Sequence, residues 1–84
     1  MNILEMMSRS FIKPYEVNMV LYVNDQYKET GSKRFKTLRE AFDQYHEAER
    51  LAKDYKSLLL AIDHEWVISI WDSKDKQILC RKTI

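Results

Sequence analysis

The chain has 84 residues, of which 45% are hydrophobic and 32% are charged, and its 14 basic and 13 acidic side chains leave a net charge of +1. This length predicts a single domain, residues 1–84, with a small core. The charge balance gives no overall electrostatic reason to bind nucleic acid or an anionic membrane, and no apolar run approaches the ~20 residues that span a bilayer. One cysteine excludes an intramolecular disulfide, so we expect a reducing, cytoplasmic setting.

Residues 1–14 form an N-terminal segment with two open interpretations. Asn2 and Glu5 have the spacing of a helix start, and Pro14 would end a short helix. Alternatively, translation starts at a later methionine, and the first residues are a mobile tail.

A hairpin is predicted next. Tyr15 to Asn24 alternates between an apolar and a more polar side, which indicates a half-buried strand. Asp25 to Ser32 contains the only glycine and reads as the connection, with Gly31 at positive φ. Lys33 to Lys36 is then a short return strand with one aromatic side chain pointing inward.

The clearest element is a helix over residues 37–56. Thr37 and Glu40 have the T-x-x-E spacing of a capping box at its start. Apolar residues at spacings of three and four form one stripe that would pack on a sheet. The stripe consists of Leu38, Ala41, Phe42, Tyr45, Ala48, Leu51, Ala52 and Tyr55.

The last third of the chain predicts a second hairpin. Two interpretations compete for residues 57–62: a fifth strand, which we favour because a helix through Ile62 would be long for so small a domain, or an extension of the helix. Residues 65–71 are rich in β-branched and aromatic side chains and form a strand. A polar turn at 72–76 leads into a return strand at 77–82.

Together these elements predict an α+β fold of two layers, in which a small antiparallel sheet packs on one main helix. The order is β-β-α-β-β, with an optional fifth strand and an optional short N-terminal helix. If Trp71 pairs with Ile78, Ser69 pairs with Cys80. The other face of the sheet would then be open to water or to a partner.

No stretch carries a catalytic, metal or cofactor signature. His46 falls near the solvated side of the helix, and His64 lies in a predicted turn without further ligands at metal-site spacing. Cys80 lies in a strand, where a lone cysteine is usually a small buried hydrophobe. We therefore expect no enzymatic activity, no cofactor and no metal.

One local basic cluster suggests an alternative function. Its side chains alternate with Phe35 and lie near Tyr22 and Tyr27, so a sheet face could hold single-stranded nucleic acid by phosphate contact and stacking. The near-neutral charge favours a simpler interpretation, an edge strand protected by lysines. The cluster consists of Lys33, Arg34, Lys36 and Arg39, with Arg81 and Lys82 in the last strand.

The tryptophans indicate an outward apolar surface. Trp66 and Trp71 are five residues apart in one strand, so they lie on opposite faces of it. An uncovered aromatic patch is typical of a protein interface. The alternatives are that residues 1–12 fold back over this patch or that a homodimer buries it. Compact proteins of this character, encoded by phages and other mobile elements, often bind and modulate a larger host protein. The predicted partner-binding residues are Trp71, Tyr22 and Val20 as apolar anchors, with Arg34, Lys36 and Lys82 at the rim.

Overall fold

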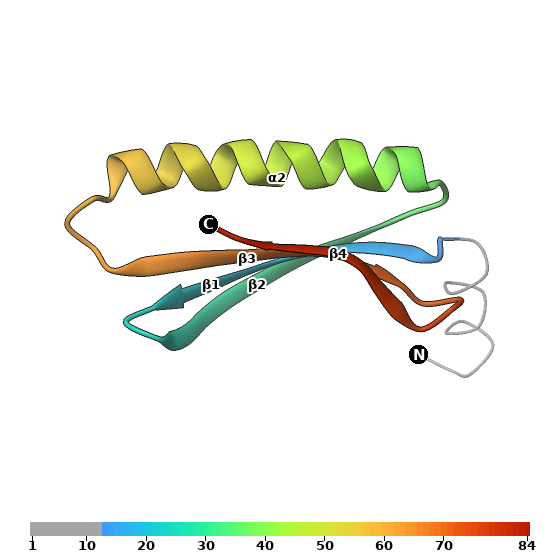
Figure 1. Cartoon of the computed structure of the whole chain (residues 1–84), viewed down its shortest axis with the longest axis horizontal. Coiled ribbons are helices and arrows are strands. Elements are labelled where there is room, and N and C mark those ends of the chain that lie inside the picture. Colours follow the sequence, from blue (N-terminus) through green and yellow to red (C-terminus); the bar gives the residue numbers. More distant parts are fainter. Residues whose placement is uncertain (1–12) are drawn as a thin grey trace.

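In the computed structural model, which describes residues 13–84, four strands form one sheet and a single helix lies on one face of it (Figure 1). The helix predicted within residues 1–14 falls almost entirely outside the described residues. The elements in chain order are β1 (Tyr15–Val23), β2 (Gln26–Phe35), α2 (Leu38–Leu58), β3 (His64–Asp72) and β4 (Gln77–Thr83).

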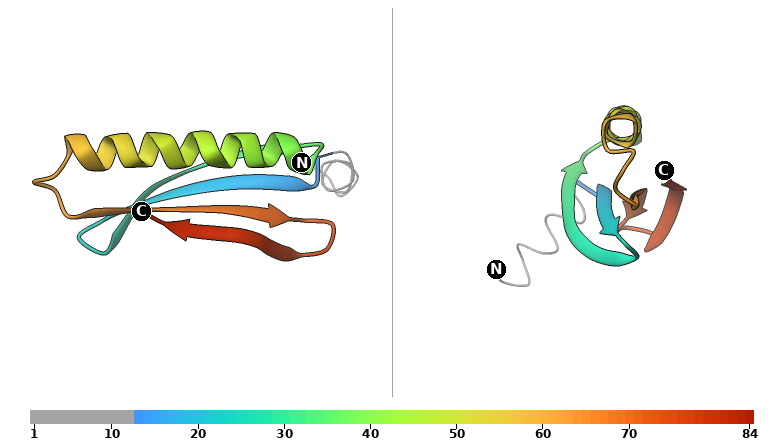
Figure 2. Two further views of the ribbon diagram at one scale, coloured as in Figure 1. Left: turned by 45° about the horizontal axis from the view of Figure 1, so that its top comes forward. Right: turned by 90° about the vertical axis from the view of Figure 1, so that its left-hand side faces the viewer.

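The sheet is antiparallel throughout, and its strand order is β2-β1-β3-β4. The two hairpins therefore meet along β1 and β3, which form the centre of the sheet. Viewed along the long axis, the helix lies over one side of a curved sheet (Figure 2). The predicted two-layer α+β architecture is confirmed.

Helix α2 begins where the capping box predicts. The Thr37 hydroxyl accepts a hydrogen bond from the Glu40 amide at 3.2 Å and donates one to the Glu40 carboxylate at 2.9 Å. The helix packs through small residues, since Ala41, Ala48 and Ala52 are at most 3% exposed. These alanines allow the helix backbone to approach the sheet closely, opposite the fully buried side chains of β3.

The favoured strand over residues 57–62 is wrong, because the helix continues to Leu58 and a turn follows. A 21-residue helix is about 31 Å long, close to the ~30 Å of a nine-residue strand, so α2 spans the sheet it covers. Both edges of β3 are already paired, with β1 and β4, which leaves no edge beside it for another strand. Leu58 and Leu60 are consequently 77% and 86% exposed.

The predicted connection of the first hairpin is also wrong. The turn is only Asn24 and Asp25, which have φ values of 51° and 64°, and Gly31 is not at positive φ. Asn and Asp tolerate left-handed φ, and a tight two-residue turn with two such residues matches the twist of a hairpin. Strand β2 therefore starts at Gln26, and Gly31 lies in its middle.

A β-bulge changes the register of the second hairpin. Trp71 pairs with Ile78 as predicted, but Ile70 pairs with Cys80 and Ser69 with Arg81. The shift between Ile70 and Trp71 leaves an extra residue on β4, which turns every later side chain of that strand to the opposite face. This single irregularity decides which basic residues of β4 face outward.

Candidate interaction surfaces

The sheet face opposite α2 gathers the predicted apolar anchors. Val20 lies opposite Val67, and Trp71 lies opposite Ile78, so their side chains share this face across the central and outer strands. Val20, Tyr22 and Trp71 are each half-buried. No other layer formed by residues 13–84 covers them (Figures 1 and 2). We call this surface the outward face; its apolar members are Val20, Tyr22, Tyr27, Val67, Trp71 and Ile78.

The rim residue Arg34 lies on the outward face, as predicted. It pairs with Glu16 across β1 and β2, and the guanidinium and carboxylate are 3.1 Å apart. Glu16 in turn lies opposite Trp71 in β3, which places this ion pair beside the indole. Lys36 is exposed in the connection between β2 and α2.

The expectation that Lys82 lies at the same rim is wrong. Lys82 pairs with Ile68, which is fully buried under the helix, and its ammonium group contacts the Glu49 carboxylate of α2. The bulge at Leu79 causes this, because it moves Lys82 to the helix side and brings Arg81 to the outward face. Arg81, opposite Ser69, is therefore the basic residue of β4 that lies on the outward face in place of Lys82.

The basic residues that the sequence groups together do not form one surface. Arg34 and Arg81 lie on the outward face, whereas Lys33 and Lys82 lie on the helix side. Glu16 and Glu49 neutralise two of them. The continuous basic track that holds a nucleic-acid backbone is therefore not formed by these residues.

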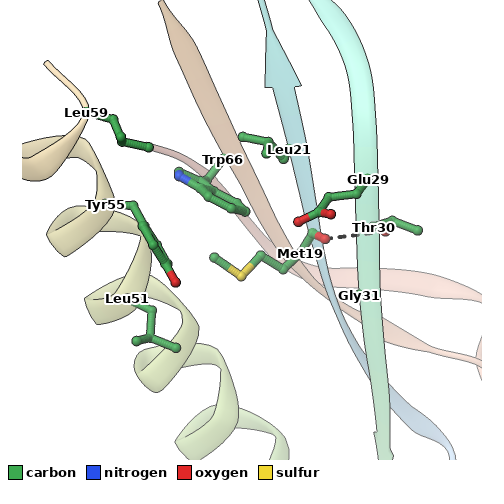
Figure 3. Close-up of a pocket in the computed structure, with 9 residues that line it drawn as sticks. All are labelled: Met19, Leu21, Glu29, Thr30, Gly31, Leu51, Tyr55, Leu59 and Trp66. Atoms are coloured by element: carbon green, nitrogen blue, oxygen red, sulfur yellow. Dashed lines mark hydrogen bonds between the residues drawn. The ribbon is translucent and has the colours of Figure 1, made fainter. Parts of the chain in front are cut away.

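A groove of about 540 Å³ separates the C-terminal half of α2 from the first hairpin, with Trp66 at its base (Figure 3). The sequence places Leu51 and Tyr55 in the buried stripe, but they are 37% and 45% exposed because β2 diverges from the helix here. No periodicity in the sequence signals this gap. The groove is lined by Met19, Leu21, Glu29, Thr30, Gly31, Leu51, Tyr55, Leu59 and Trp66.

His64 begins β3 and does not lie in a turn as expected. It is 3% exposed, its Nδ1 lies 2.8 Å from the carbonyl oxygen of Ile62, and its ring meets Trp66 edge-on. The Nε2 atom of His64 and the Nε1 atom of Trp66 are buried without a hydrogen-bond partner among residues 13–84. His46 is exposed, and its Nδ1 lies 3.8 Å from Glu49.

Cys80 lies on the helix side of β4, opposite the fully buried Ile70. Burial raises the pKa of its thiol, and burial also raises the pKa of the neighbouring Tyr45 hydroxyl. The thiol is thus protonated at neutral pH and a weak nucleophile. Within residues 13–84, no three His, Cys, Asp or Glu side chains are grouped to hold a metal ion.

Comparisons with protein-family models, with curated proteins and with solved structures give no match to this chain. In the described range 13–84, no helix combines the length and the apolar character needed to cross a membrane.

Proposed function

We propose that this protein is a non-enzymatic binding module that contacts a larger protein through the outward face and modulates or inhibits it. Trp71, Tyr22 and Val20 are the apolar anchors, and Arg34 and Arg81 provide polar contacts at the edge. Aromatic side chains and arginine are the residue types that contribute most to binding energy at protein interfaces.

The observation that carries the proposal is the arrangement of β3. Its alternate residues Trp66, Ile68 and Ile70 are at most 9% exposed beneath α2, whereas Val67 and Trp71 point to the side that no other described element covers. An aromatic residue held rigidly on a sheet loses little conformational entropy when a partner covers it. The outward face therefore suits a partner with a complementary apolar patch.

Single-stranded nucleic acid is the weaker candidate, since the basic side chains are divided between the two faces. Binding through phosphates would fall steeply as salt rises, whereas binding through an apolar patch would survive moderate salt. The salt dependence of complex formation thus separates the two functions.

The test is affinity capture from the native cell with the full chain, followed by titration of the purified partner. Trp71→Ala removes the central anchor and should weaken binding by about tenfold or more, as expected for a hot spot. Leu58→Ala is the control, because it removes an exposed apolar side chain from the other side of the molecule. Equal affinity of the wild type and the folded Trp71→Ala variant would contradict the proposal.

A further inference from the structure

Strand β2 leaves one edge of the sheet open. It lies at the end of the strand order, so only β1 pairs with it among residues 13–84. It is ten residues long, and its first eight residues are all exposed. A long exposed edge carries backbone amide and carbonyl groups that can pair with another strand.

The middle of β2 has a self-complementary pattern. Residues 29–33 read Glu-Thr-Gly-Ser-Lys, so reversing the direction exchanges the two charges and keeps the small residues in place. We propose that β2 pairs antiparallel with β2 of a second copy of this chain, with Gly31 on the two-fold axis. Glu29 of each copy then lies opposite Lys33 of the other copy, which gives two such pairs, and Thr30 lies opposite Ser32.

The side-chain geometry fits this pairing. Glu29 lies opposite Leu21 and Lys33 opposite Val17 in β1, so both charged residues point to the helix side of the sheet. Neither forms an ion pair within residues 13–84, and the Lys33 ammonium lies 5.7 Å from the Phe35 ring centroid. The second copy would provide each of them with an opposite charge.

Gly31 supports the same axis. Its φ is not positive, so no turn requires a glycine here, and a Cβ atom at this position would meet nothing within 4 Å. A glycine inside a strand costs stability and often marks a place where another backbone approaches closely. In the proposed pairing, Gly31 leaves the helix side of the sheet free of side chains on the two-fold axis, between the two pairs of Glu29 and Lys33.

The charges also select one register. A shift of two residues in one direction places Glu29 opposite Gly31, and in the other direction it places Lys33 opposite Gly31. Both shifts lose both ion pairs, so the pairing centred on Gly31 is preferred over its neighbours. Lys28 is the extra residue of a β-bulge in the pairing of β2 with β1, and in the dimer it would come near Arg34, whose charge Glu16 already balances.

In the resulting dimer, both helices lie on the same face of an eight-stranded sheet. The grooves of the two copies would face each other across the new β2 pair, with Leu51 and Tyr55 of each copy along the sides of one apolar trough. Residues 13–84 of neither copy would cover the outward face in this arrangement. The dimer is therefore independent of the proposed function, and either can fail without the other.

Sedimentation velocity of the full chain, from about 1 to about 200 µM, tests the proposal. The wild type should shift from the mass of one chain to that of two. Glu29→Lys and Lys33→Glu should each weaken the dimer about tenfold or more, because each replaces two attractive cross-strand pairs by two repulsive ones. Asp43→Lys makes the same charge change as Glu29→Lys on the exposed side of α2 and should leave the dimer unchanged.

Mixing the two weakened variants is the sharper test. The Glu29→Lys chain carries a positive charge at both positions, and the Lys33→Glu chain carries a negative charge at both. Every cross-strand pair between the two chains then joins opposite charges, so a heterodimer should form at wild-type affinity. The double variant Glu29→Lys/Lys33→Glu should also dimerise by itself. Thermal unfolding shows that each variant is folded.

Two results would overturn the proposal. One is a wild-type chain that stays monomeric over the whole concentration range. The other is a dimer that neither single charge reversal weakens, since that dimer would use a different surface. Trp71→Ala should dimerise like the wild type whatever its effect on the larger partner.

Discussion

The two faces of the sheet differ although the same strands build both. Along β3, the residues that point to α2 are buried, whereas Val67, Ser69 and Trp71 on the other face are only half-buried. Ile68 and Ile70 have no exposed surface, because the alanines of α2 close over them. The helix-facing side thus buries the core of the domain, and the other side retains apolar surface that no other element within residues 13–84 covers.

The two tryptophans provide the largest expected contrast. Trp66→Ala should lower the free energy of unfolding by about 3–5 kcal/mol, because it removes a buried side chain and leaves a cavity. Trp71→Ala should cost only about 1–2 kcal/mol, since its indole is half-buried and no other layer formed by residues 13–84 covers it. Urea unfolding of both variants measures the difference, and equal losses would contradict the distinction between the faces.

Replacing a small side chain by a larger one should also affect the two faces of the sheet differently, with a smaller change in the free energy of unfolding. Ala48→Leu should cost about 1–3 kcal/mol, because the space between α2 and the sheet is already filled. Ser69→Leu places the same side chain on the outward face and should change the free energy of unfolding by about 0.5 kcal/mol or less. A comparable loss at Ser69 would mean that a further layer covers the outward face.

The ion pair between β4 and α2 gives the smallest effect. The Lys82 ammonium holds the pKa of the Glu49 carboxyl below its ordinary value of 4.5, with further lowering by the charges of Lys53, Lys82 and His46. A lowered pKa stabilises the fold above pH 4.5, and this contribution is lost as the pH falls through the folded-state pKa. The free energy of unfolding of Lys82→Met should therefore fall less on acidification than that of the wild type.

Urea unfolding of both proteins at about pH 6 and about pH 3 measures this dependence. An identical loss of stability on acidification would show that Glu49 gains nothing from Lys82. Lys74→Met, which removes an exposed lysine that forms no ion pair among residues 13–84, is the matched control and should keep the acid dependence of the wild type.

The sequence predicts most of the fold, because hydrophobic periodicity identifies the helices and strands that have one face buried in the core. The alternation of β1, the stripe of α2 and the aromatic run of β3 all come from contact with one core. Strand β2 has little such signal, since its first eight residues are exposed and it is polar along most of its length. The apolar residues 58–62 have the pattern of a buried strand although they are exposed, and this pattern is why the sequence wrongly predicts a strand there.

The outward face could be predicted in part. The outward positions of Val20 and Tyr22 in β1 and of Trp71 in β3 follow from the alternation of side chains along each strand, which the sequence alone contains. The position of Lys82 depends on a bulge at Leu79, which is a property of the pairing between two strands. The groove likewise depends on how far β2 diverges from α2, and no local pattern encodes that distance.

Acrylamide quenching of single-tryptophan variants tests the central claim, that the two faces differ in access, most directly. Trp66→Phe leaves only Trp71, and Trp71→Phe leaves only Trp66. We predict that Trp71 fluorescence is quenched readily in the folded protein, whereas Trp66 becomes equally accessible only after unfolding. Equal protection of both tryptophans in the folded state would contradict an uncovered outward face and, with it, the proposed binding surface.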